Sequence, residues 1–165
     1  MPDRHPATLD QDALLAQCQA HRSRTSGPGG QHRNKVETAV DLIHQPTGVT
    51  GAASERRSQV ENKRVALFRL RVNLALEIRT DYTPDKYPSE LWRSRCRKGR
   101  IAINPKHHDF PALLAEALDV LAFRDHDPKS AALLLDCSMS QLVKLLKLDP
   151  RALEQVNAHR HRPLK

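Results

Sequence analysis

A run of ten residues near the N-terminus, SGPGGQHRNK at 26–35, has the composition of a loop that does chemistry through its backbone. It contains three glycines and one proline, and it has no large apolar side chain. Glycine adopts backbone angles closed to other residues, whereas proline fixes its own φ and removes a donor. We therefore expect an exposed loop whose backbone amides either act on a reacting group or bind a phosphate.

The known glycine-rich nucleotide patterns are missing from the sequence. A P-loop requires GxxxxGK[ST], and a dinucleotide fingerprint requires GxGxxG between a strand and a helix. Neither occurs, and no GxSxG nucleophile elbow occurs either. Hence no nucleotide-dependent enzyme is indicated.

The chain is strongly basic, with 27 Lys and Arg against 19 Asp and Glu among 165 residues, a net charge of +8. Two stretches carry the excess: residues 21–79 hold 11 basic and 5 acidic residues, and residues 92–100 hold 5 basic and no acidic ones. A concentrated positive field favours a polyanionic partner, and nucleic acid before a membrane surface.

Metal and disulfide chemistry have little support. Cys18, Cys96 and Cys137 are far apart and form no CxxC pair. The adjacent His107 and His108 are not spaced as ligands on one helix face, and we find no carboxylate or thiol partner for them at ligand spacing. We therefore expect no metal and no other cofactor. Without a signal-peptide pattern or a membrane span, we expect a cytoplasmic protein with no membrane partner.

Short elements flank the glycine-rich run. Residues 10–17 predict a helix capped by Asp10. Alternating polarity and β-branched residues predict three strands, and a Pro-early, Gly-late turn at 45–48 joins the last two into a hairpin. The predicted strands are 18–25, 36–44 and 49–53.

A long helix is predicted over residues 58–79. Ser58 and Glu61 fit a capping box, in which the two side chains reciprocally satisfy free amides. The stripe expected to face the sheet is Val60, Leu67, Leu70, Leu74 and Ile78. The other faces are expected to carry Arg56, Arg57, Lys63, Arg64, Arg69 and Arg71.

The composition changes after this helix. Residues 80–108 contain three prolines and the basic run 92–100, which is typical of a connector, with a short strand expected at 101–103. Residues 109–165 are rich in leucine and alanine and predict four helices, two of them begun by Asp-Pro pairs and one by Ser138.

The middle of this helical unit, residues 131–146, is similar to a helix-turn-helix, whose second helix can enter a major groove. Its charge is nearly balanced, with 9 basic and 8 acidic residues over 101–165. That balance favours a small packing module over direct reading of DNA.

Gly29-Gly30-Gln31 resembles the catalytic triplet of class I peptide chain release factors and of their smaller ribosome-rescue relatives. The surrounding residues strengthen the resemblance, because they follow the family's order and approximate spacing over about 18–79. These are Ser26-Gly27-Pro28, Asn34-Lys35, Thr38-Ala39-Val40, Pro46-Thr47-Gly48, Arg57-Ser58-Gln59 and Asn62-Lys63.

The resemblance implies hydrolysis of the peptidyl-tRNA ester in the ribosomal peptidyl transferase centre. Gly29, Gly30 and Gln31 would be catalytic, with the backbone amide of Gln31 stabilising charge on the reacting oxygens. The Gln31 side chain would position water, and family members are often methylated there. The residues expected to contact rRNA and tRNA are Arg24, Arg33, Asn34, Lys35, Arg56, Arg57, Lys63 and Arg64.

The predicted fold class is α+β: a small antiparallel sheet with an exposed GGQ loop and one long packed helix, then a C-terminal all-α, helix-turn-helix-like unit. We divide the chain into an arm with a short helix (1–17), the catalytic domain (18–79), a basic connector (80–108) and a helical unit (109–165). The partners would be the ribosome, through large-subunit rRNA and peptidyl-tRNA, with an additional recruiting factor as a further candidate.

Three departures from the family shape the functional prediction. The chain has no room for stop-codon-reading domains, its basic C-terminus is short where small rescue factors carry a long basic tail, and Arg33 replaces a small apolar residue. We therefore expect a codon-independent hydrolase acting in termination or ribosome rescue. Two alternatives stay open: a non-catalytic ribosome- or RNA-binding protein of the same fold, and a DNA-binding regulator acting through the helical unit.

Overall fold

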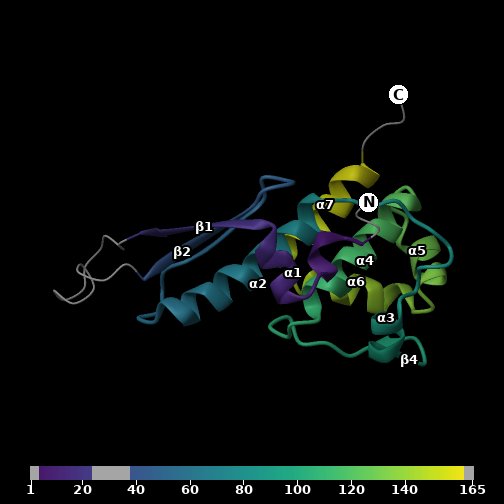
Figure 1. The fold of residues 1–165 in the computed structure, drawn as a ribbon. Helices are drawn as coiled ribbons and strands as arrows, with labels where there is room; N and C mark the ends of the chain where they lie inside the picture. The colour runs from purple at the N-terminus through teal and green to yellow at the C-terminus, as the bar shows by residue number, and fades with distance from the viewer. Residues whose placement is uncertain (1–3, 24–37, 162–165) are drawn as a thin grey trace. The chain divides into compact units, whose positions relative to one another are not determined.

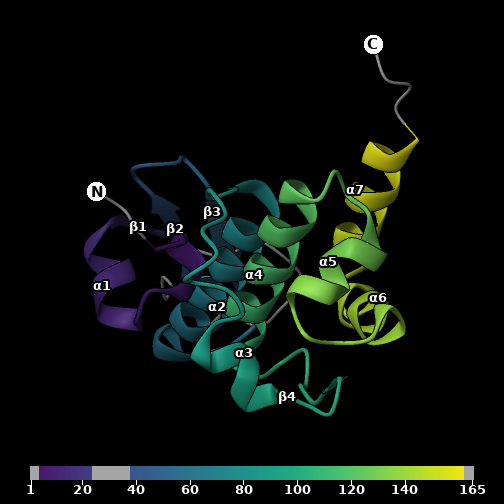
Figure 2. The ribbon, with the colours of Figure 1, turned by 90° about the vertical axis from the view of Figure 1, so that its right-hand side faces the viewer.

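The computed structural model describes residues 4–23 and 38–161 and divides into two compact units, Met1–Glu77 and Ile78–Lys165. The first unit combines a small sheet with a long helix (Figure 1), and the second is mainly helical (Figure 2). The predicted mixture of a small antiparallel sheet with several helices is confirmed. No helix in the described ranges combines the length and hydropathy of a membrane span.

The sheet of the first unit is a three-stranded antiparallel meander, in the order β1 (Cys18–Ser23), β2 (Ala39–His44), β3 (Thr50–Ala53). The register places Ser23 opposite Ala39 and Val40 opposite Ala53. The three predicted strands are therefore confirmed within the described residues. The predicted turn is also present, because the amide of Gly48 donates to the carbonyl of His44 at 2.7 Å and Gly48 has a φ of 75°.

Two short helical segments precede the sheet. These are η1 (Pro6–Thr8), a 3-10 turn, and α1 (Gln11–Ala16). Asp10 caps α1 as predicted, since its side chain accepts a hydrogen bond from the amide of Ala13 at 2.8 Å. The carboxylate satisfies one of the amides that a helix start leaves without an intrahelical partner.

Helix α2 (Gln59–Glu77) lies along β2 and β3 (Figure 1). The Ser58 half of its predicted cap is present, with the amide of Glu61 3.4 Å from Ser58 Oγ. The prediction for Val60 is wrong: it is 63% exposed, because Asn62 takes the buried position in this first turn. The buried row continues every four residues through Ala66, Leu70 and Leu74, with Leu67 buried beside it, whereas Ile78 lies beyond the end of the helix.

Arg71, which we predicted on a face of α2 other than the apolar stripe, is not a surface residue. Its side chain is buried, and its Nε and Nη2 donate to the carbonyl of Ala7 at 3.1 and 2.9 Å. A buried guanidinium requires acceptors, and this one is supplied by a residue 64 positions earlier in the chain. Arg71 therefore fixes η1 against α2. A local sequence pattern does not reveal this contact, because the two residues are far apart in the chain.

The second unit contains five helices and a two-stranded hairpin among its described residues. Asp127, Ser138 and Asp149 cap three of the helices with their side chains, as their positions in the sequence predict. The helix at 90–95 and the strand at 96–97 were not predicted. The strand expected at 101–103 is only two residues long and begins one residue earlier, at Arg100. The elements are α3 (Glu90–Arg95), β4 (Cys96–Arg97), β5 (Arg100–Ile101), α4 (Phe110–Phe123), α5 (Pro128–Leu134), α6 (Met139–Lys147) and α7 (Pro150–Arg160).

Helix α4 is buried almost throughout and carries two acidic side chains into the core of this unit, Glu116 and Asp119. Glu116 accepts from the amide and the hydroxyl of Ser89 at 2.7 and 2.5 Å. Asp119 accepts from the amide of Thr80 at 3.1 Å and from its hydroxyl at 2.5 Å. These bonds join the segment before α3 to α4, and they compensate the removal of two carboxylates from water.

We expect Glu116→Gln to change how the stability of the second unit depends on pH. Burial raises the pKa of Glu116, and this outweighs the hydrogen bonds from Ser89, which lower it. A raised pKa in the folded state means that stability falls as pH rises from about 4.5, the ordinary value, through the folded pKa. The variant keeps an acceptor for the Ser89 amide and cannot ionise, so its stability should lack this fall.

The measurement is urea unfolding over a pH series, followed by the fluorescence of Trp92. Trp92 is the only tryptophan in the chain, is 1% exposed, and donates to the carbonyl of Leu135 at 2.7 Å. Its emission therefore reports on the second unit. Parallel pH curves for wild type and Glu116→Gln would contradict the prediction.

Candidate catalytic and RNA-binding site

The segment that carries the predicted catalytic residues connects two paired strands. β1 ends at Ser23, and Ser23 lies opposite Ala39 near the start of β2. Gly29, Gly30 and Gln31 belong to residues 24–37 between them, outside the described residues. The predicted RNA contacts Arg24, Arg33, Asn34 and Lys35 lie there as well. We call residues 24–37 the catalytic segment after these predictions. The structure describes its frame, which is the paired ends of β1 and β2 on either side of it.

A buried amide side chain fixes the frame at the β2 end. Asn62 is fully buried, and its Nδ2 donates to the carbonyls of Thr38 and Arg56 at 2.6 and 2.9 Å. Its Oδ1 accepts from the amide of Arg56 at 2.9 Å. Asn62 therefore ties α2 to the residue that follows the catalytic segment and to the loop before the helix. In the sequence, Asn62 was singled out only as part of the family pattern. Its burial inside a helix, with these hydrogen-bond partners all on the backbone, indicates that it positions the neighbouring segments.

We expect Asn62→Ala to lower the free energy of unfolding of the first unit by about 2–4 kcal/mol, because a fully buried side chain loses three hydrogen bonds at roughly 1 kcal/mol each. Asn73→Ala is the matched control on the same helix, where Nδ2 donates to the carbonyl of Thr50 at 2.8 Å in an exposed position. Its loss should be smaller than that of Asn62→Ala, because this hydrogen bond is exposed to water. Chemical denaturation followed by circular dichroism measures both, and equal losses would contradict a special role for Asn62.

The other four predicted RNA contacts gather at the same end of α2. Arg56 and Arg57 precede the helix, Lys63 and Arg64 lie in its second turn, and all four are exposed. None of them forms an ion pair with another residue of the described ranges. Because Asn62 joins this end to Thr38, the structure brings these four cations to the frame of the catalytic segment.

The neighbouring Arg69 differs from these four because it is already neutralised. Its Nη2 lies 2.6 Å from Glu55 Oε1, and its Nη1 donates to the carbonyl of Ala52 at 2.9 Å. Nearby amide hydrogen bonds and the Arg69 guanidinium lower the pKa of Glu55 to about 2. Glu55 therefore stays ionised near neutral pH and is paired with Arg69, which leaves the four cations available for phosphate.

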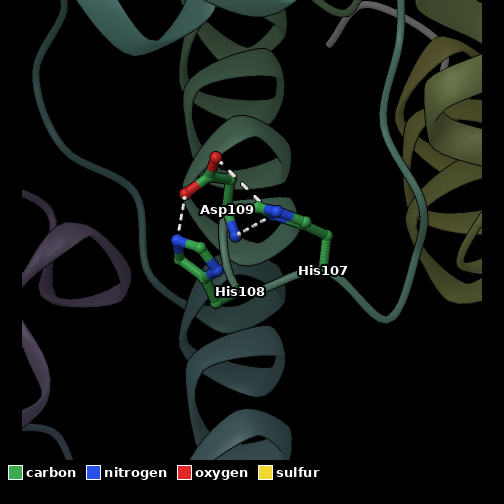
Figure 3. Close-up of side chains that lie close together, drawn as sticks. All are labelled: His107, His108 and Asp109. Carbon is green, nitrogen blue, oxygen red and sulfur yellow. Dashed lines mark hydrogen bonds and ion pairs between the residues drawn. The ribbon is translucent and has the colours of Figure 1, made fainter.

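A second cluster lies in the other unit, where His107, His108 and Asp109 precede α4 (Figure 3). The prediction that His107 and His108 have no carboxylate partner is wrong. His108 Nε2 lies 3.0 Å from Asp109 Oδ1, and His107 Nδ1 lies 3.5 Å from Asp109 Oδ2. One ligand atom from each of the three residues lies within 4.8 Å of the others. The sequence signal was available, since Asp109 directly follows the pair.

Other contacts already occupy most of these atoms. His107 Nδ1 accepts from the amide of Asp109 at 3.1 Å, and Asp109 Oδ2 accepts from Arg95 Nη2 at 2.6 Å. Burial raises the pKa of Asp109, but the hydrogen bond from Arg95 and the charge of His108 lower it by more, so the net pKa is below its ordinary value. An ionised Asp109 paired with Arg95 fits a structural link from α3 to α4 better than a metal centre.

The sequence that forms these elements matches a known protein family. Residues 10–104 match the family described as "RF-1 domain", which is more than half of the chain. The chain belongs to this family. The matched range includes residues 24–37, the four exposed cations in and before the start of α2, and the β4–β5 hairpin. This confirms the resemblance drawn from the sequence.

Several relatives are named peptide chain release factors. Peptide chain release factor 1 of Ureaplasma parvum is 51% identical over 51 residues, 31% of this chain and 14% of the relative. The chloroplastic peptide chain release factor PrfB1 of Arabidopsis thaliana is 54% identical over 52 residues, 32% of this chain and 11% of the relative. Peptide chain release factor 2 of Lactiplantibacillus plantarum is 42% identical over 67 residues, 41% and 18% of the two chains. This RF-1 domain protein therefore spans less than a fifth of the length of these three relatives.

Proposed function

We propose that this RF-1 domain protein hydrolyses the ester bond of peptidyl-tRNA on the ribosome, without reading a codon. The observation that carries the proposal is the family match over residues 10–104, because it includes the Gly29-Gly30-Gln31 triplet within its family pattern. The names of the relatives support a role in translation termination. Codon independence rests on the sequence, in which we identify no stop-codon-reading motif.

The proposed chemistry needs few groups from the protein. Water attacks the ester carbonyl, and negative charge develops on the carbonyl oxygen and on the departing ribose oxygen. The backbone amide of Gln31 donates to this charge, which is worth most when the donor is positioned in advance. Gly29 and Gly30 allow the amide to approach, and the Gln31 side chain positions the water.

The exposed cations near the start of α2 position the protein on RNA. Arg56, Arg57, Lys63 and Arg64 bind RNA phosphates at the frame of the catalytic segment, together with Arg24, Arg33, Asn34 and Lys35 from the segment itself. Phosphate contacts fix register and orientation without carrying sequence information. The ribosome, through its rRNA and peptidyl-tRNA, is then the partner, and the cytoplasm is the place of action. Residues 18–79 form the catalytic domain in this proposal, and the C-terminal helices serve as a packing module.

One observation weakens the alternative of a DNA-reading regulator. A helix-turn-helix protein contacts base edges with the N-terminal residues of its second helix, which would be α6. The hairpin residues Gly99 and Ile101 already contact this end: Gly99 accepts from the amide of Ser138 at 3.2 Å, and the amide of Ile101 donates to Gln141 Oε1 at 3.2 Å. Ser138, Met139 and Ser140 are exposed, but the hairpin lies directly beside them, so a major groove would have to accommodate the hairpin together with the helix.

The test is release of labelled formyl-methionine from initiator tRNA on purified 70S ribosomes. Wild type and Gly30→Ala are compared, each with and without a stop codon in the A site. Release by wild type alone, and to the same extent with either codon, supports the proposal. Sedimentation with ribosomes and no release would instead support the non-catalytic RNA-binding alternative.

A further inference from the structure

The short β4–β5 hairpin of the second unit has an unusual distribution of charge. Lys98 and Gly99 form its two-residue turn, with φ values of 50° and 74°. This is the turn geometry that matches the twist of paired strands, but it places a lysine in the left-handed region. Arg97 lies directly opposite Arg100 in the register. Like charges in such a cross-strand pair are destabilising, so three cations are held together at some cost to the fold.

The hairpin is fixed to the helices of its unit at several points. Besides the two hydrogen bonds to Ser138 and Gln141, Cys96 Sγ donates to the carbonyl of Asp136 at 3.5 Å. Gly99 also forms an isolated bridge with Cys137. The hairpin and the start of α6 therefore form one continuous surface.

Helix α6 adds to the charge of this surface. Leu142, Leu145 and Leu146 are buried, while Ser140, Lys144 and Lys147 are exposed at spacings of four and three residues, which puts them on one helix face. We name the hairpin–α6 surface for its exposed members: Arg97, Lys98, Arg100, Ser140, Lys144 and Lys147. None of its five cations forms an ion pair with another residue of the described ranges, and Asp136 is the only acidic residue within 96–101 and 136–148.

We propose that the hairpin–α6 surface binds the phosphate backbone of double-stranded RNA, as a second contact separate from the catalytic segment. Five unpaired cations suit a polyanion. No aromatic residue occurs in the hairpin or in α6, so this surface lacks the stacking platform that single-stranded bases require. The choice of RNA over DNA rests on the proposed function, since ribosomal RNA is the duplex that the protein would meet.

The test uses the full-length protein and a short fluorescein-labelled RNA duplex, with binding followed by anisotropy over a salt series. The variant is Arg97→Gln, Lys98→Gln and Arg100→Gln together. Its matched control is Arg124→Gln, Lys129→Gln and Arg160→Gln, three exposed cations of the same unit outside the surface. The slope of log affinity against log salt should fall by about 2 in the hairpin variant, at roughly 0.7–0.9 per lost phosphate contact. The control should keep the wild-type slope.

The hairpin variant should also melt no lower than wild type, because the Arg97–Arg100 repulsion is gone. Wild-type affinity in this variant, an equal loss in the control, or tighter binding of a DNA duplex of the same sequence would overturn the proposal. The peptide-release assay separates this inference from the proposed function. RNA binding that depends on the hairpin, in a protein that releases no peptide, would leave the inference standing and reject the hydrolase.

Discussion

Replacing Gln31 with proline is expected to slow peptide release on the ribosome by about 10²–10³-fold, the loss typical of removing one amide donor from a site that stabilises an oxyanion. Proline lacks the N–H group, so the substitution removes the donor that the proposed mechanism requires. The rate constant for release at saturating protein is the quantity to measure, because it separates chemistry from binding to the ribosome.

Gln31→Ala is the control, since it removes the side chain and keeps the backbone amide. We expect it to retain most of the rate lost by Gln31→Pro, and to lose selectivity between water and larger nucleophiles such as hydroxylamine. Sedimentation with ribosomes should be unchanged in both variants. If the two substitutions slow release equally, the side chain rather than the amide carries the chemistry.

Gly51→Ala is expected to lower the free energy of unfolding of the first unit by about 3 kcal/mol or more, at or above the upper end of the range for overpacking. Gly51 lies in β3 and packs against the backbone of α2 more closely than either of the other described glycines packs against its neighbours. A Cβ there would overlap the carbonyl oxygen of Ala66 and the amide nitrogen of Leu70, and it would lie 2.7 Å from Leu70 Cα. These are backbone atoms, so no rotamer change relieves the overlap.

Gly48→Ala separates close packing from backbone conformation. Gly48 has a φ of 75°, but a Cβ added there would meet nothing within 4 Å. Alanine in this left-handed conformation should cost roughly 1–2 kcal/mol. Thermal and denaturant unfolding followed by circular dichroism would compare the two variants. A loss for Gly51→Ala no larger than that for Gly48→Ala would show that α2 moves away from the sheet at little cost.

Local signals in the sequence predicted much of the fold. Asp10, Asp127 and Ser138 cap helices because an N-cap bond reaches only two or three residues along the chain, and such signals are readable without tertiary structure. The strands of the sheet followed from alternation and from the turn before Val49. At the candidate site, Arg56, Arg57, Lys63 and Arg64 stay predicted RNA contacts, and the structure adds their common location at one end of α2.

The remainder depended on partners distant in sequence. Val60 matched the apolar spacing of α2 but is exposed, whereas Arg71 looked like a surface residue and is buried on Ala7. Asn62 is buried because Thr38 and Arg56 supply its hydrogen-bond partners. Helix α3 was missed because it is only six residues long, and its buried Trp92 donates to the carbonyl of Leu135, 43 positions later at the end of α5. Periodicity carries no information about such pairings.

The pairing of Ser23 with Ala39 has a consequence for how this protein can evolve. The sheet holds the two ends of the connection 24–37 together, because Ser23 and Ala39 are paired across β1 and β2. The entropy of closing a connection grows only with the logarithm of its length, and doubling the length costs about 0.6 kcal/mol. A change in the length of this connection therefore costs little closure entropy, so β1, β2 and α2 can persist in homologues whose connections differ in length.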